Sequence, residues 1–143
     1  MDRIEREVVI EAPVERVWEL VTQAEHLGRW FGDAGAEVDL RPGGAMSLSW
    51  EEHGTVRGRI EAVEPRRLFS FRWGREEPAP GNSTLVEFTL AGEGAGTRLR
   101  VVESGFEQLD VPVEQQRAKH EDNTEGWRIE LGELREYSAK VAA

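Results

Sequence analysis

Apolar and polar residues alternate near the start of the chain. Ile4, Val8 and Ile10 share one side of an extended segment, and the positions between them are largely glutamates. A period of two over this length is typical of a half-buried strand, which we expect from Ile4 to Glu11. Arg6 falls on the apolar side, so it should lie near the rim of the core.

The spacing of apolar residues changes to that of a helix after Pro13, a residue that suits the first helical turn. Positions i, i+3, i+4 and i+7 form one stripe, and here they are Val14, Val17, Trp18 and Val21. We expect Trp18 to contribute to the core. A second short helix should cover Ala24–Trp30, with Phe31 directly after it.

A period of two returns at residue 36. The predicted strands are Ala36–Leu40, Ala45–Glu51, Thr55–Val63, Leu68–Trp73, Thr84–Leu90 and Thr97–Ser104. Turn-rich segments such as "RPGG" and "EPRR" separate them, so consecutive strands should pair antiparallel as a meander. The connection "GREEPAPGNS" at 74–83 is the longest and should form an exposed tip.

The last part of the chain, from Pro112 to about Ala139, reads as one long helix. Trp127, Leu131 and Leu134 form its apolar stripe, whereas the same face is mostly polar before Gly126. The element order predicts an α+β fold, in which a curved antiparallel sheet of about six or seven strands wraps around this helix. Such curvature tends to leave space between the sheet and the helix.

One face of the predicted sheet is rich in aromatic side chains. Its residues are Met46, Leu48, Trp50, Val56, Gly58, Ile60, Ala62, Phe69, Phe71, Trp73, Val86, Phe88, Leu90, Leu99, Val101 and Glu103. These side chains either fill a solid core or line an apolar pocket with few polar groups, the usual form of a small-molecule site. The polar first half of the long helix and Glu103 favour the pocket.

The charge balance narrows the choice of partners. The chain has 18 Lys+Arg against 28 Asp+Glu and a formal net charge of -10, which disfavours nucleic acid and anionic membrane surfaces. It has no cysteine, and its three histidines show no metal-ligand spacing. We therefore expect no metal and no cofactor. The charged start of the chain has no apolar run, so we expect a cytoplasmic protein.

Two residues are candidates for acid/base chemistry. Glu103 on the inner face could act as a general acid or base, or it could lie at a strand end and pair with a charge such as Arg6. His120 could face the pocket, or it could be an ordinary residue of the helix surface or a packed histidine. No nucleophile motif surrounds Ser104. Catalysis is therefore the least supported of the functional hypotheses.

Seven segments in one order carry a resemblance to a known family. They are "IEAPVERVWELVT", "WF", "PGG", "GRIEAVEPRRLFSFRW", "TLVEFTL", "GTRLRVVESGF" and "GW". Together they resemble the SRPBCC superfamily (START-like and Bet v 1-like proteins), most closely the branch related to the C-terminal domain of the activator of Hsp90 ATPase. The resemblance spans nearly the whole chain and implies a single domain over 1–143.

The resemblance implies a helix-grip fold with a deep apolar cavity between sheet and long helix. Trp127 should point at the sheet, Gly126 should let the helix backbone lie close, and Trp30 and Phe31 should lie at the mouth. Many relatives carry a histidine where this chain has Asn123. Taken with the inner face, the candidate cavity residues are Trp30, Phe31, Trp50, Ile60, Phe71, Trp73, Phe88, Val101, Glu103, Phe106, His120, Asn123 and Trp127.

The preferred hypothesis is a non-catalytic protein that binds a small apolar or amphipathic molecule inside this cavity. The family resemblance leaves two alternatives, a module that contacts a chaperone or another protein, and a cyclase, dehydratase or hydrolase acting in the cavity. The sequence also leaves a homodimer possible.

Overall fold

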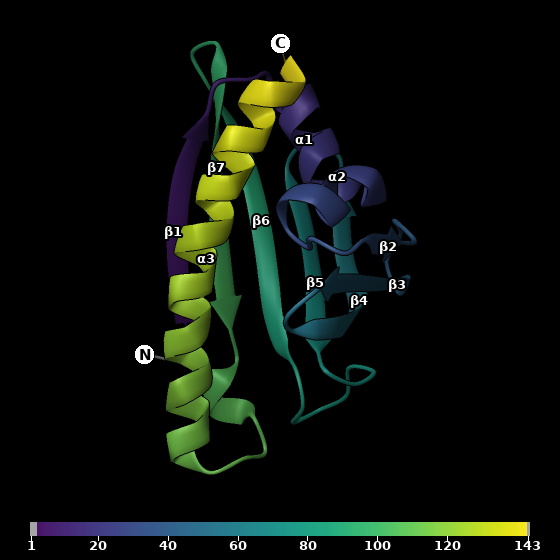
Figure 1. Ribbon diagram of the computed structural model, residues 1–143, viewed down its shortest axis with the longest axis vertical. Coiled ribbons are helices and arrows are strands. Elements are labelled where there is room, and N and C mark those ends of the chain that lie inside the picture. The colour runs from purple at the N-terminus through teal and green to yellow at the C-terminus, as the bar shows by residue number, and fades with distance from the viewer. Residues whose placement is uncertain (1–2, 143) are drawn as a thin grey trace.

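The computed structural model describes residues 3–142 as one antiparallel sheet and three α-helices (Figure 1). The elements are β1 (Arg3–Ile10), α1 (Val14–Thr22), α2 (Ala24–Trp30), β2 (Ala36–Val38), β3 (Ala45–Trp50), β4 (Gly54–Glu64), β5 (Leu68–Gly74), β6 (Thr84–Glu93), β7 (Gly96–Ser104), the 3-10 turn η1 (Phe106–Gln108) and α3 (Val113–Ala142). The predicted order of elements is confirmed; η1 was not predicted.

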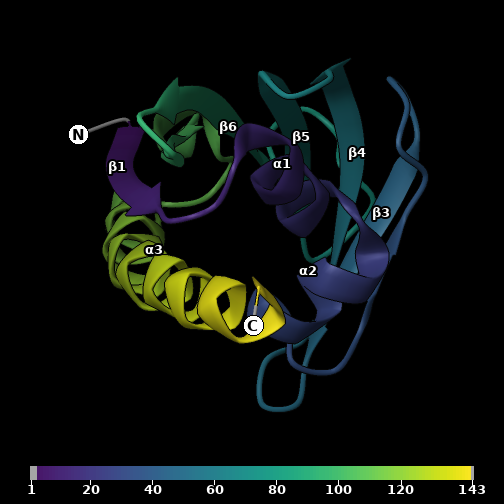
Figure 2. The ribbon, with the colours of Figure 1, turned by 90° about the horizontal axis from the view of Figure 1, so that it is seen from above.

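The seven strands form a single sheet in the order β1-β7-β6-β5-β4-β3-β2. Every neighbouring pair is antiparallel: consecutive strands from β2 to β7 lie side by side as a meander, and β1 pairs with β7. Seen from above, the sheet curves from β1 to β3 with α3 across its open side (Figure 2). This arrangement is the expected helix-grip fold.

The alternation of side chains places the predicted inner face against the helices. Phe71 lies opposite Val86 across β5 and β6, and Val86 lies opposite Glu103 across β6 and β7. All four of Phe71, Val86, Phe88 and Glu103 are fully buried. The strand register therefore places the carboxyl group of Glu103 among the buried aromatic side chains.

One inner-face assignment was wrong. A β-bulge lies between Ile60 and Ala62 in β4, so the strand gains a residue relative to β5. After the bulge Val63, rather than Ala62, pairs with inner Phe69 and packs against the core. A bulge is set by pairing with the neighbouring strand, and alternation along one strand does not reveal it.

The two short helices cover one end of the sheet beside α3 (Figures 1 and 2). In α1 the fully buried residues include Val17, Leu20 and Val21, while Trp18 is half-buried and packs against the core. Trp18 is thus a peripheral core residue, as its place on the helix allows. In α2, Leu27 and Trp30 are buried.

Candidate functional site

Glu103, near the end of β7, has no exposed surface and accepts hydrogen bonds from four side chains. The indole Nε1 of Trp127 donates to Oε1 at 2.8 Å, and that of Trp73 donates to Oε2 at 2.9 Å. The Thr84 hydroxyl donates to Oε2 at 2.6 Å, and the Asn123 amide reaches both oxygens at 3.1 and 3.0 Å. The carboxyl group thereby joins β5, β6, β7 and α3.

All of these partners are neutral donors, which suits an acceptor-only carboxylate. The alternative expectation, an ion pair with Arg6, is wrong: within residues 3–142 no basic side chain forms an ion pair with Glu103. Arg6 instead lies near Glu125 on α3, an exposed carboxyl group whose pKa is lowered chiefly by its hydrogen bond from Arg128 and, to a smaller extent, by the charge of Arg6. Buried charges need such partners to offset the loss of water.

Aromatic rings surround this carboxyl group. The ring of Trp127 lies 5.8 Å from those of both Trp73 and Phe88, measured between centroids. Phe31 lies 5.3 Å from Trp127, 5.5 Å from Trp73 and 5.6 Å from Trp50. We call the six rings the aromatic cluster; its members are Phe31, Trp50, Phe71, Trp73, Phe88 and Trp127. All six were among the predicted cavity residues.

Phe31, a member of the cluster, and its neighbour Trp30 are buried rather than at the surface, since each is 3% exposed. Their rings stack at 5.1 Å, and the Trp30 indole donates a 2.7 Å hydrogen bond to the Leu20 carbonyl of α1. Trp30 is therefore fixed to the short helices, while Phe31 faces the sheet and α3. The partly exposed members of the cluster are Trp50 and Trp73.

The backbone of α3 runs closest to β1, η1 and α2. Over β5 and β6 the space is bridged by side chains, chiefly Trp127 against Trp73 and Phe88. The expectation that Gly126 lets the helix lie close to another segment was wrong. A Cβ built at Gly126 meets no atom within 4 Å, and the same holds for Gly132. Close packing does not explain either glycine.

Besides Glu103, the site contains a second carboxyl group, that of Glu130 on α3. The sequence analysis did not predict it. Burial and the nearby carboxylates of Glu133 and Asp33 raise the pKa of Glu130 to about 8, whereas a hydrogen bond from the side chain of Trp50 opposes this shift. The Oε2 atom of Glu130 is buried and has no hydrogen-bond partner. Helical spacing offered a signal, because Asn123, Trp127 and Glu130 follow at +4 and +3.

Thr84 was also missed, although it shares strand parity with Val86 and Phe88 and so belongs to the inner face. The side chain is 3% exposed. Its hydroxyl donates to Glu103 and also lies 3.1 Å from the Trp73 indole. Thr84 therefore supports both groups at the centre of the aromatic cluster.

His26 and Tyr137 join α2 to α3 on the same side of the fold. The Nδ1 atom of His26 lies 2.6 Å from the Tyr137 hydroxyl, and the rings pack edge to face. Burial lowers the pKa of His26. This contact and the carboxylates of Asp33, Glu130 and Glu133 all belong to the side on which α3 meets α2 and the loop that follows it.

The remaining predicted residues lie elsewhere. Ile60 and Val101 are buried in the core. His120 is half-buried near the start of α3, where its ring packs on Phe106 at 5.1 Å and its Nε2 atom lies 3.2 Å from the Arg3 carbonyl. No hydrogen bond joins His120 to Glu103 among the described residues, so the two acid/base candidates do not form a pair.

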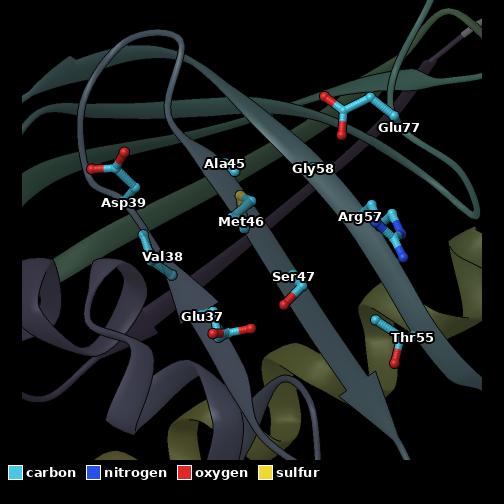
Figure 3. Close-up of a pocket in the computed structure, with 10 residues that line it drawn as sticks. All are labelled: Glu37, Val38, Asp39, Ala45, Met46, Ser47, Thr55, Arg57, Gly58 and Glu77. Atoms are coloured by element: carbon cyan, nitrogen blue, oxygen red, sulfur yellow. The ribbon is translucent and has the colours of Figure 1, made fainter.

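Two surface hollows are found outside the aromatic cluster. One lies on the outer face of β2, β3 and β4, with Glu37 and Asp39 on one side and Arg57 and Glu77 on the other (Figure 3). The other lies between the end of β1 and the last turns of α3, including Arg135 and Glu136. None of the predicted cavity residues lines either hollow.

Over the described part of the chain, no group of three or more His, Cys, Asp or Glu side chains is arranged to hold a metal ion. Among the helices in residues 3–142, none is both long enough and apolar enough to span a bilayer.

Comparison with known proteins agrees with this geometry. Residues 11–139 match the family described as Activator of Hsp90 ATPase homolog 1-like protein. The chain belongs to this family. Its helix-grip sheet, long helix and aromatic interior place it within the SRPBCC-type proteins that the sequence resembled. The family supports a module that binds a ligand or a partner protein. A search of the curated proteins finds no significant match.

Similar solved structures extend the comparison. Protein MLL2253 from Mesorhizobium loti is 24% identical, with a TM-score of 0.80 and coverage of 96% of this chain and 97% of its own. BH1534 from Bacillus halodurans is 29% identical, with a TM-score of 0.76 and coverage of 96% and 97%. DynU16, described from the dynemicin biosynthetic locus, is 26% identical with a TM-score of 0.76. This chain is covered to 96% but spans only 47% of DynU16.

Proposed function

We propose that this protein is a non-catalytic binding module for a small apolar or amphipathic molecule, held between α3 and the inner face of the sheet. The observation that carries the proposal is the aromatic cluster, in which side chains rather than backbone contacts bridge α3 to β5 and β6. Aromatic side chains around a few placed polar groups are typical of small-molecule sites.

Entry of a ligand requires some of these rings to move. Trp50 and Trp73 are the natural candidates, because both are partly exposed whereas Phe71 and Phe88 are fully buried. A ligand that replaced the Trp50 ring against Phe31 would keep the apolar contacts of the cluster. We therefore place the entrance between Trp50 and α3.

A small-molecule role also agrees with one relative. DynU16 is described as a protein of the dynemicin biosynthetic locus, a setting that fits a protein handling small molecules. Catalysis is less well supported, since both oxygens of Glu103 are already occupied by Trp73, Thr84, Asn123 and Trp127. A general base needs a free acceptor within reach of the proton that it removes.

The first test is native mass spectrometry of freshly purified protein, followed by denaturing release of any bound compound. Binding of a neutral fluorescent probe, Nile red, is then measured for the wild-type protein and for Trp50→Ala. The matched control is Trp18→Ala, a half-buried tryptophan of α1 outside the aromatic cluster.

We expect Trp50→Ala to change the affinity for Nile red by about tenfold in either direction, equivalent to about 1.4 kcal/mol. The direction depends on whether Trp50 contacts the probe or blocks its entry. Trp18→Ala should leave the affinity within about twofold. Absence of both a released compound and saturable probe binding would contradict the proposal, as would equal affinities in the wild type and Trp50→Ala.

The family description supplies a second candidate function, contact with a chaperone of the Hsp90 kind. The formal net charge of -10 would favour a basic surface on such a partner. The test is the ATPase rate of a purified Hsp90-type chaperone with and without this protein at equal concentration. An unchanged rate, together with no co-elution in size-exclusion chromatography, would count against this candidate.

A further inference from the structure

The strongest unexplained feature beside the aromatic cluster is Glu130, a half-buried residue of α3 with one buried carboxyl oxygen. One of its carboxyl oxygens is sheltered from solvent without a hydrogen-bond partner, and the side chain of Trp50 lies close enough to act on the pKa of the carboxyl group. Buried polar atoms in folded proteins nearly always have a partner, so an unpaired one calls for a physical reason. Glu130 adjoins the entrance inferred above between Trp50 and α3.

The surroundings of Glu130 carry only negative charge. Asp33, in the loop after α2, and Glu133, one turn further along α3, are both exposed, and both disfavour ionisation of Glu130. Throughout residues 3–142, no arginine, lysine or histidine forms an ion pair with any of these three carboxyl groups. The proposed entrance therefore has the acidic side chains of Asp33 and Glu133 close to the aromatic ring of Trp50.

A further acidic residue, Glu103, lies in the core. Glu103 is fully buried, and its hydrogen bonds come from neutral donors, so no cation of the chain balances it. A ligand with a carboxylate or phosphate group would meet the half-buried carboxyl group of Glu130 and the buried one of Glu103, and no basic side chain paired with either. A cation would instead be attracted by the carboxylates and by the π faces of the tryptophans.

We propose that the ligand is an amphipathic cation, whose ammonium group lies at Glu130 beside Trp50 and whose apolar body lies against Phe31 and Trp73. This inference rests on the proposed function and deepens it by naming the ligand class. The positive charge would supply the partner that the sheltered oxygen of Glu130 lacks. It would also relieve the repulsion from Asp33 and Glu133.

Cation binding at this place should be linked to a proton. Because the pKa of Glu130 is about 8, its carboxyl group is largely protonated at pH 7, and a bound cation would favour release of that proton. The charged groups that face Glu130 are Glu133 on its own helix and Asp33 from the neighbouring loop. Affinity for a permanent cation should therefore rise between pH 7 and pH 9.

The experiment compares three probes that share a twelve-carbon chain: dodecyltrimethylammonium, dodecanol and dodecanoate. Each is titrated below its aggregation concentration, and binding is followed by the intrinsic tryptophan fluorescence, because three of the five tryptophans belong to the aromatic cluster. The proteins are the wild type, Glu130→Gln and Glu121→Gln. Glu121 is an exposed glutamate of α3, so its variant removes one charge without changing the entrance.

In the wild type we expect the ammonium probe to bind about tenfold more tightly than dodecanol at pH 7, with dodecanoate the weakest. The preference should grow at pH 9. Glu130→Gln should reduce the preference to about twofold and remove its pH dependence, and Glu121→Gln should keep both. Glutamine preserves the size of the side chain, so a large loss of folding is not expected.

Three outcomes would overturn the inference. Equal binding of all three probes to the wild type would contradict the ligand class while leaving the proposed function standing. A preference that persists unchanged in Glu130→Gln would remove Glu130 from the site. Failure of every probe, dodecanol included, to bind the wild type would contradict the proposed function and the inference together.

Discussion

Replacing Glu103 with glutamine tests whether its carboxylate holds α3 to the sheet. The substitution keeps the size and shape of the side chain, so no cavity forms. It removes the charge and converts one acceptor oxygen into an NH2 donor. Trp127 and Asn123 can keep an acceptor at the Oε1 position, where they now lie 2.8 and 3.1 Å from the carboxylate.

The loss of stability should come mainly from the Oε2 position. An NH2 group at the Oε2 position would face the Trp73 N–H at 2.9 Å and the Thr84 hydroxyl at 2.6 Å. The hydroxyl can rotate to become an acceptor, and the Trp73 indole can retain Thr84 Oγ1 at 3.1 Å. The main loss is therefore charge assistance, since hydrogen bonds to charged groups contribute about 1.5–3 kcal/mol and neutral ones about 0.5–1.5 kcal/mol.

Removal of the buried charge also spares a desolvation cost, which offsets part of that loss. We expect Glu103→Gln to lower the free energy of unfolding by about 1–3 kcal/mol. Glu103→Leu should cost more, because it leaves the Trp127 indole and the Asn123 amide without an acceptor. The measurement is urea denaturation at pH 7, with Glu121→Gln as the control, expected within about 0.5 kcal/mol of wild type.

A double-mutant cycle sharpens the result. Trp127→Phe removes the indole donor while keeping an aromatic ring, and its coupling to Glu103→Gln should be about 0.5–3 kcal/mol. If Glu103→Gln were as stable as the wild type and showed no coupling to Trp127→Phe, the reasoning that this carboxylate fastens α3 to the sheet would be refuted.

Two further predictions concern α3. Folding raises the pKa of Glu130 from 4.5 to about 8, so the stability contributed by its protonated form is complete below pH 4.5 and is lost as the pH rises to about 8. Glu130→Gln should flatten that decline, which is on the order of a few kcal/mol, in urea denaturation at pH 5, 7 and 9; an unchanged pH profile would contradict the assignment. Gly126→Ala and Gly132→Ala should each stabilise the protein by about 1 kcal/mol in thermal unfolding, because the added methyl group meets open space. A lower melting temperature for either variant would show that its glycine has a packing role.

Part of the site around Glu103 was predictable from the sequence. Periodicity predicted that Trp73, Phe88, Glu103 and Trp127 share the interior, and the structure brings all four together. The same reading offered Arg6 as a partner of Glu103, because a charge near a strand end commonly pairs with another charge. The actual partners come from three other elements, and only the folded chain brings them within hydrogen-bonding distance.

Glu130 shows a different limit. The sequence places it near the apolar stripe of α3, but its raised pKa depends on Asp33, almost 100 positions earlier, and on the degree of burial. The bulge between Ile60 and Ala62 is similar, because it arises from pairing with β5. Neither property belongs to a short segment of the chain.

The amino-acid sequence was enough to predict the order of elements, the inner face of most strands and the family. These follow from local periodicity and from motifs, both of which are written in neighbouring residues. The tertiary structure decided which side chains meet: the donors around Glu103, the rings of the aromatic cluster, and the open space beside Gly126. These depend on the curvature of the sheet and on the distance of α3 from it, which are set by the packing of the whole chain rather than by any one segment.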